Sequence, residues 1–289
     1  MTLTASTVVL ARDEWGARET AHTARADALT RDHRERASRH ETHPVEDFLF
    51  TYYSYKPSVL RRWHPGEGVE LADAATAPRA QWRWYRPGAA PGSIVADGRA
   101  FRDERGSLVA NIATILRATR ERSGSYGCFG LHEWAMVYRQ REHRHPVPLR
   151  LGQAGTDAVV EAHELRCTHY DAFRFFTPEA VPRNRTPLAR ADQPLREQPG
   201  CLHAGMDLYK WAVKLGPLVP GEVLLDAFEL ARDVRELDMR ASPYDLTEWG
   251  YAPVRIEDPD GKAEYVQAQR GFAARGQDLR ARLLAIAEG

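Results

Sequence analysis

Residues 222–240 constrain the fold more than any other part of the chain, because their pattern is that of a long amphipathic helix. The apolar residues recur at spacings of three and four: Leu224, Leu225, Phe228, Ala231, Val234 and Leu237. Acidic residues follow another side of the same helix: Asp226, Glu229, Asp233 and Glu236. We interpret the acidic side as a solvated face paired with Arg232 and Arg235. A core built from helices is therefore expected.

Further segments predict helices or strands and set the fold class. Helices are expected over residues 12–41, 43–53, 108–120, 131–138 and 262–287, the last broken by Gly271 and Gly276. The short runs at 147–151, 158–163 and 165–170 resemble strands. The sequence thus predicts a mainly α, α+β fold, in which a helical domain carries a small antiparallel sheet around residues 147–176.

Composition limits the classes of protein to which the chain can belong. The 289 residues are 43% hydrophobic, which is typical of a globular protein. Interleaved charges near the N-terminus predict a charged helical segment over 1–42, followed by one globular domain of catalytic type over 43–289. No apolar run is long enough for a membrane span, and no secretory signal is visible, so a cytoplasmic location is expected. The 40 basic residues balance 40 acidic ones, which argues against a protein whose affinity rests on neutralising many phosphates.

Residues 200–214 hold an unusual density of reactive side chains after a proline- and arginine-rich loop. A helix that begins near Leu202 places His203 and Asp207 four residues apart on one face, followed by Lys210 and Lys214. Such a stripe suits a buried polar site. The preceding loop, residues 177–200, is long enough to act as a lid over that site.

Histidines and aspartates elsewhere in the chain suggest a metal as one alternative. Imidazole and carboxylate groups together suit zinc, iron or manganese, and an ion could be held by His132, His169, Asp171, His203 and Asp207. No second histidine follows His132 at the spacing of the zinc-peptidase helix, because Met136 stands there. The three cysteines are interpreted as buried, inert thiols, with a Cys201 nucleophile as the alternative.

Several motifs resemble a poorly characterised actinobacterial family whose members are commonly labelled 3-methyladenine DNA glycosylases. These motifs are His43-Pro-Val-Glu-Asp-Phe-Leu-Phe-Thr-Tyr-Tyr-Ser54, Arg61-Arg-Trp-His-Pro-Gly66, Phe129-Gly-Leu-His-Glu-Trp-Ala-Met-Val-Tyr-Arg139, His169-Tyr-Asp-Ala-Phe-Arg-Phe-Phe-Thr-Pro178, Gly200-Cys-Leu-His203 and Met206-Asp-Leu-Tyr-Lys-Trp211. The resemblance implies hydrolysis of the N-glycosidic bond of an alkylated purine, in DNA or a nucleotide. Such an enzyme needs aromatic faces for a cationic base and a carboxylate to orient water or to stabilise the sugar cation.

The resemblance implies roles for residues of this chain. Asp207 is the preferred carboxylate, and Asp171 and Glu133 are its alternatives. Acid–base partners would be His132, His169 and His203. Substrate contacts would come from Lys210, Trp211, Trp134, Tyr138, Tyr52 and Tyr53.

Two other functions stay open on the sequence alone. One is a metal-dependent enzyme that uses the histidine–aspartate set on a small molecule, although no cofactor is required by the sequence. The other is a non-catalytic interaction protein whose polar clusters only satisfy its core. No membrane partner and no obligate protein partner are expected.

Overall fold

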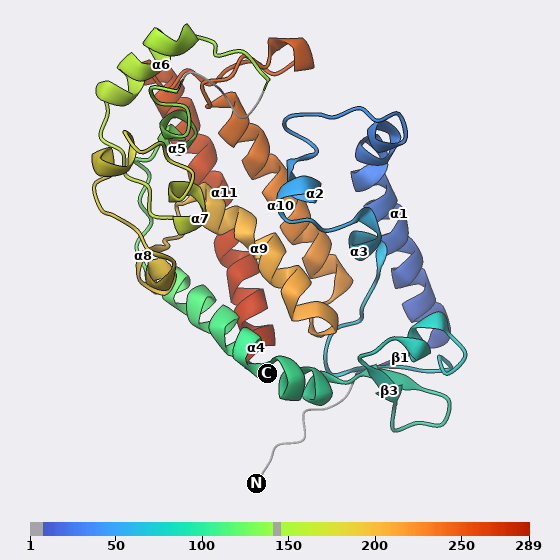
Figure 1. Cartoon of the computed structure of the whole chain (residues 1–289). Coiled ribbons are helices and arrows are strands. Elements are labelled where there is room, and N and C mark those ends of the chain that lie inside the picture. The colour runs from blue at the N-terminus through green and yellow to red at the C-terminus, as the bar shows by residue number, and fades with distance from the viewer. Residues whose placement is uncertain (1–7, 141–145) are drawn as a thin grey trace.

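The computed structural model describes residues 8–140 and 146–289, so residues 1–7 of the expected charged segment 1–42 lie outside the described residues. Helices dominate this part of the chain (Figure 1), and the mainly α, α+β class is confirmed. The long helices are α1 (Arg12–Ser38), α4 (Gly98–Glu121), α9 (Leu202–Leu215), α10 (Gly221–Arg240) and α11 (Pro259–Glu288). None of the helices in the described ranges is both long and apolar enough to cross a membrane.

Shorter elements connect these helices. The short α-helices are α2 (Phe48–Tyr52), α3 (Pro57–Arg61), α5 (Leu131–Ala135), α6 (Gly152–Glu161), α7 (Tyr170–Phe173) and α8 (Gln193–Arg196). The 3-10 helices are η1 (Pro78–Gln81), η2 (Val181–Arg183), η3 (Arg190–Asp192), η4 (Gly216–Leu218) and η5 (Thr247–Trp249). The expected loop over 177–200 therefore contains η2, η3 and α8.

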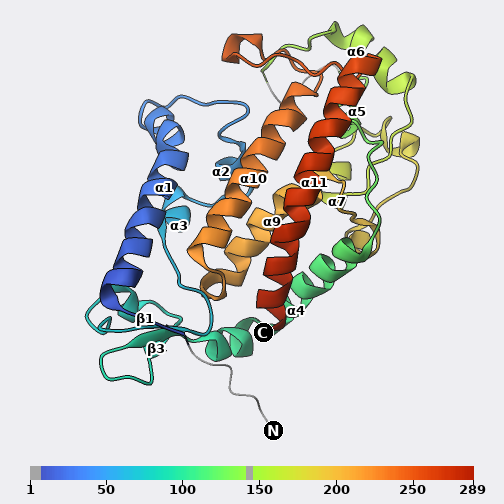
Figure 2. The ribbon, with the colours of Figure 1, turned by 180° about the vertical axis from the view of Figure 1, so that it is seen from behind.

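Helices α9, α10 and α11 form the centre of the molecule. They pack against one another, and α11 also packs against α4, as the front and back views show (Figures 1 and 2). Their apolar faces meet in one core, in which Ile112, Leu208, Leu230 and Leu283 are fully buried. Burial of each such side chain contributes about 1.5–3 kcal/mol. The core therefore holds α9 rigidly, together with the polar residues that it carries.

The sheet lies at a different place from the one expected. Its strands are β1 (Val8–Leu10), β2 (Val69–Leu71), β3 (Tyr85–Pro87) and β4 (Ile94–Ala96), in the order β1-β2-β4-β3. Only β1 and β2 are parallel, so the sheet is mixed. The prediction of an antiparallel sheet around residues 147–176 is wrong, because α6 and α7 occupy much of that region. Val159 and Val160 fit the buried side of a helix as well as a short strand.

Two expectations about surface helices are also corrected. Helix α11 runs unbroken through Gly271 and Gly276, because the cost of a helical glycine, about 1 kcal/mol, is smaller than the gain from packing. Helix α1 is not fully solvated, since Trp15 and His22 are buried. Arginines of α1 and α11 also form ion pairs with the acidic residues of α10.

The acidic side of α10 is paired mainly with neighbouring helices, although Arg232 of the same helix also lies 3.8 Å from Asp233, as expected. Arg25 of α1 reaches Asp226 at 2.9 Å and Glu229 at 2.8 Å, while Arg275 of α11 reaches Asp233 at 2.8 Å. Arg235, expected on that solvated face, is buried instead. It is free to serve a different set of carboxylates inside the molecule.

His64 generates a prediction about acid stability. Its Nδ1 lies 2.9 Å from the Tyr85 hydroxyl, and burial, together with Arg79 and Arg62 nearby, lowers the pKa of His64 to about 3. An unfolded histidine has a pKa of about 6.5, so only the unfolded chain takes up this proton as the pH falls from about 6.5 towards 3. The His64 contribution to stability is therefore complete above about pH 6.5 and is lost in acid.

The change His64→Asn should flatten this acid dependence. Between pH 6 and pH 4, the free energy of unfolding from urea titrations should fall less steeply than in the wild type, by up to about 1.4 kcal/mol per pH unit. The matched change His40→Asn, at an exposed residue, should keep the wild-type slope. Equal slopes for His64→Asn and wild type would contradict the assignment.

Candidate functional site

Helix α9 presents the predicted polar face towards the interior. It begins at Leu202, as expected, and both His203 and Asp207 are buried. Three other segments bring polar side chains to this face. Helix α5 supplies His132, the residue before α7 supplies His169, and α10 supplies Asp238.

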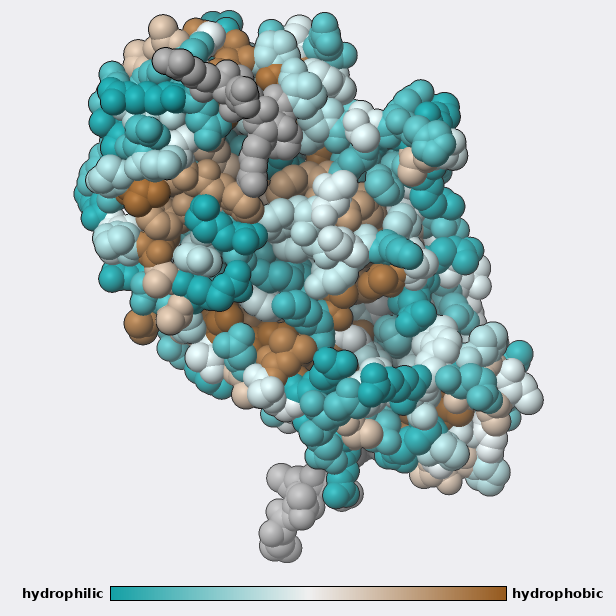
Figure 3. All heavy atoms as spheres, viewed as in Figure 1, coloured by the Kyte–Doolittle hydropathy of each residue, from teal (hydrophilic) through white to brown (hydrophobic). Residues whose placement is uncertain are grey.

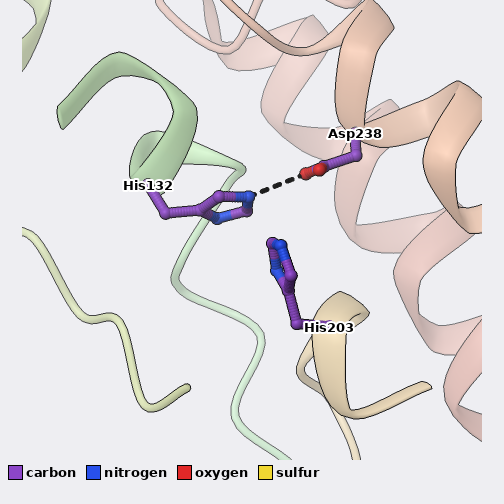
Figure 4. A group of neighbouring side chains, drawn as sticks. All are labelled: His132, His203 and Asp238. Carbon is purple, nitrogen blue, oxygen red and sulfur yellow. Dashed lines mark ion pairs between the residues drawn. The ribbon is translucent and has the colours of Figure 1, made fainter. Parts of the chain in front are cut away.

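The first cluster, here called the His132 group, consists of His132, His203 and Asp238. Figure 4 shows these side chains pointing towards one another from three separate elements. The Nε2 atom of His132 lies 2.9 Å from Oδ1 of Asp238, and the rings of His132 and His203 meet edge to face at 4.5 Å. One ligand atom from each residue falls within 4.8 Å of the others, and all three residues are buried.

The contact between His132 and Asp238 is a close ion pair whose atoms are not aligned as a regular hydrogen bond. Neither His132 Nε2 nor Asp238 Oδ1 has a hydrogen-bond partner among the described residues, although both atoms are buried. A buried polar atom left in this condition costs about 1–3 kcal/mol. Both atoms are therefore available to a common third partner.

The pKa values of all three residues in the His132 group are shifted from their usual values. Burial opposes the charge on His132, but Asp238 outweighs it and raises the pKa of His132 well above its usual value. Burial likewise opposes the charge on Asp238, and the nearby His132 outweighs it and lowers the pKa of Asp238. Burial and the proximity of His132 lower the pKa of His203 well below its usual value. The neutral imidazole, which is the form that ligates metals, is thus favoured at His203, whereas an ion would have to displace the proton of His132.

The second cluster, the His169 group, consists of His169, Glu197 and Asp207. The Nε2 atom of His169 lies 3.0 Å from Glu197 Oε1 and 3.3 Å from Asp207 Oδ2. Burial opposes the charge on His169, but Glu197 and Asp207 raise its pKa to about 9. The ring of His169 stacks on that of His203 at 5.3 Å, so the two groups adjoin.

Asp207 is well supplied with partners. Its carboxylate accepts hydrogen bonds from the Tyr53 hydroxyl at 2.8 Å and from the ammonium of Lys210. Burial raises the pKa of Asp207, yet Lys210 and His169 outweigh this and lower it. The Lys210 ammonium therefore already serves this carboxylate as its cation. Of the two groups, the His132 group is the better fit for a metal ion.

A cavity of about 420 Å³, here called the His203 cavity, adjoins the His132 group. Its walls are partly aromatic and partly charged, and the residues that line it include Phe48, Tyr52, Glu133, Asp171, Phe175, His203 and Arg235. The carboxylate of Glu133 accepts a hydrogen bond from Arg235 at 3.1 Å, and that guanidinium lies 3.4 Å from Asp238. His203 and Arg235 thus link the cavity to the His132 group.

The remaining predicted site residues are distributed unevenly. Tyr52 and Asp171 line the cavity, and Asp171 also lies 3.6 Å from Lys210. The predicted substrate contacts Trp134, Tyr138 and Trp211 are buried away from the cavity wall. Trp134 donates to the Ala241 carbonyl, and Tyr138 donates to Glu161. These two aromatic residues are therefore occupied in packing the fold.

Two residues of the site were missed by sequence reasoning. Asp238 interrupts the apolar side of α10, four residues after Val234, and a carboxylate at such a position signals a buried function. Glu197 lies just after α8 in the proline-rich segment, where no periodic pattern marks it. The loop expected to be a lid thus contributes a carboxylate to the His169 group.

The three cysteines gather beside the His132 group as free thiols. Burial raises the pKa of both Cys167 and Cys201, so neither is an activated nucleophile. The sulfur of Cys128 lies 3.7 Å from Nδ1 of His132. That contact orients the ring, so that Nε2 faces Asp238.

The Tyr53–Asp207 hydrogen bond predicts a measurable loss of stability. The change Tyr53→Phe removes one donor from a buried carboxylate, so the free energy of unfolding should fall by about 1–3 kcal/mol. Tyr55→Phe is the matched control, because the Tyr55 hydroxyl makes no hydrogen bond within residues 8–140 and 146–289. Urea titration of both variants measures the difference. Equal losses in the two variants would count against the role given to Tyr53.

Comparison with protein-family models, with curated protein sequences and with solved structures finds no significant match to this chain. Function therefore has to be argued from the geometry and chemistry of the site. The two adjoining histidine–carboxylate groups and the His203 cavity are the features that carry such an argument.

Proposed function

We propose that this protein is a metal-dependent enzyme that acts on a small molecule, with the ion held by His132, His203 and Asp238. The observation that carries the proposal is the 2.9 Å contact between His132 Nε2 and Asp238 Oδ1, two buried atoms without a hydrogen-bond partner among the described residues. Two ligands of one ion approach each other in this way without donating to each other. A cation would satisfy both atoms.

The ligand set supports the same proposal. Two histidines and one carboxylate hold catalytic zinc in several enzymes and non-haem iron in others, and these sites keep a coordination position open. Because His203 both belongs to the group and lines the His203 cavity, a bound ion would lie beside the space for a substrate.

The chain's own residues fit the remaining tasks of such a site. When bound, the ion would activate a water molecule or polarise a substrate oxygen. Glu133, fixed by Arg235, offers a carboxylate on the cavity wall that can accept a proton. The rings of Phe48, Tyr52 and Phe175 provide apolar surface that excludes water from the substrate. The volume of about 420 Å³ lies within the range for small-molecule sites.

Metal content tests the proposal directly. Wild-type protein purified without chelators should contain at least about half an equivalent of zinc, iron or manganese by plasma mass spectrometry. Asp238→Asn should contain less than about a tenth, because an amide is a poor ligand for these ions. The control Asp233→Asn changes a half-buried aspartate on the acidic side of the same helix, paired with Arg275, and should keep the wild-type content.

Folding is checked alongside the metal content. Circular dichroism and Tm establish that each variant is folded, and His203→Gln provides a second ligand change if Asp238→Asn is unstable. Folded wild-type protein that stays metal-free after dialysis against zinc would contradict the proposal.

The second candidate is the N-glycosylase implied by the sequence resemblance, and the lining of the His203 cavity favours it. A 3-methylated adenine is cationic, and aromatic rings beside carboxylates attract such a base. Glu133 and Asp171 supply the carboxylates and Tyr52 supplies a ring, while Arg235 and Arg174 lie over the rings of Phe48 and Phe175. Asp207, the carboxylate preferred on sequence, does not line this cavity, so we assign its role to Glu133.

Release of free base from methylated DNA, with and without chelator, separates the two candidates. Glycosylase activity should survive the chelator and should fall at least about a hundredfold in Glu133→Gln. Glu179→Gln, at an exposed glutamate, should retain the wild-type rate. Absence of base release by folded wild-type protein would rule out this second candidate.

A further inference from the structure

A larger cavity of about 690 Å³, here called the Lys214 cavity, lies at the C-terminal end of α9. The start of α4, the segment around Trp82–Tyr85 and the last turn of α9 form its walls. None of its lining residues belongs to the His203 cavity. In the lower part of the face in Figure 3, hydrophobic surface lies between the helices and the lobe that carries the sheet, with hydrophilic side chains around it.

Aromatic rings form one part of this cavity. Tyr55, Trp82, Trp84 and Tyr85 line it and are only half-buried, and the guanidinium groups of Arg62 and Arg83 lie over the rings of Trp82 and Trp84. The rings are braced by edge contacts, with Trp82 at 5.8 Å from Tyr85 and Trp84 at 5.1 Å from Phe101. Braced aromatic faces of this kind stack on flat heterocycles, and each stacked base contributes about 1–3 kcal/mol.

Cations form the other part. Arg62, Arg83, Arg105 and Lys214 line the cavity, and none of its lining residues within the described ranges is acidic. Arg83 and Arg105 share Glu104, at 2.6 and 3.4 Å. Arg62 and Lys214 form no ion pair with any residue that the structure describes. The wall thus carries uncompensated positive charge.

The surroundings of Lys214 disfavour its positive charge when no anion is bound. Burial, together with Lys210 nearby, lowers the pKa of Lys214. Arg62 lies over the ring of Trp82, with its guanidinium carbon 4.9 Å from the ring centroid. A bound anion would offset the charge on both side chains while its flat portion met the rings.

We propose that the Lys214 cavity binds a free nucleoside monophosphate, with the base against the aromatic wall and the phosphate at Arg62 and Lys214. Arginine forks match phosphate oxygens, and several cations suit a doubly charged group better than a single carboxylate. The volume fits a small ligand, since such pockets measure about 300–1,000 Å³. A nucleic acid polymer fits less well, because the whole chain has no net charge.

Calorimetry with AMP, GMP, CMP and UMP in the presence of EDTA tests this proposal without any contribution from a metal. At least one monophosphate should bind at least about tenfold more tightly than its parent nucleoside and than ribose 5-phosphate. The nucleoside lacks the phosphate that contacts the cations, and ribose 5-phosphate lacks the base that contacts the rings. Absence of binding by all four at millimolar concentration would overturn the proposal. So would equal binding of inorganic phosphate, or tighter binding of a single-stranded oligonucleotide.

Variants place the ligand in the cavity. Lys214→Gln and Arg62→Gln should each lower the affinity for the monophosphate at least about tenfold, since each removes a charge-assisted hydrogen bond. Trp82→Leu should lower it by a similar factor through lost stacking. Arg99→Gln is the matched control, because Arg99 is an exposed α4 arginine that does not line the cavity. Tm values confirm folding, and unchanged affinity in both cation variants would contradict the placement.

Discussion

Compensation of buried charge is the constraint on which the rest of the site depends. The central helices carry His203, Asp207, Arg235 and Asp238 into an otherwise apolar core. A buried ion without a partner costs several kcal/mol, so each charge dictates which segment must lie beside it. The ion pairs of His132 in α5 and of His169 just before α7 help to fix these short elements, in addition to their apolar contacts with the core.

The His169 group and the His132 group meet this constraint in different ways. Asp207 receives an ammonium and a hydroxyl from the protein itself, so its charge is satisfied within the chain. Asp238 Oδ1 faces a histidine nitrogen without a hydrogen bond. Two neighbouring groups of similar composition are thus unequal, and the less satisfied one adjoins the cavity through His203. This inequality supports the proposal that an ion, if bound, is held by the His132 group rather than by the His169 group.

Helical periodicity predicted much of the fold, and spacing predicted part of the site. The pattern at 222–240 and the His203–Asp207 spacing correspond to α10 and α9. Most of the sheet could not be predicted, because its strands have three residues each and β2 pairs with β1 and β4 across long stretches of chain. Glu197 joins the site only through tertiary contacts, which no local pattern reports. Arg235 was misplaced because its partners are Glu133 of α5 and the buried Asp238, and neither belongs to the acidic side of α10.

Anomalous X-ray scattering from crystals of zinc-loaded protein tests the central claim most directly. The account predicts a difference peak, measured above the zinc edge, within about 2.0–2.2 Å of Nε2 of His132 and Oδ1 of Asp238, with a His203 nitrogen as the third ligand. A map without a peak at this position, in which His132 Nε2 and Asp238 Oδ1 instead form a well-aligned hydrogen bond, would contradict it.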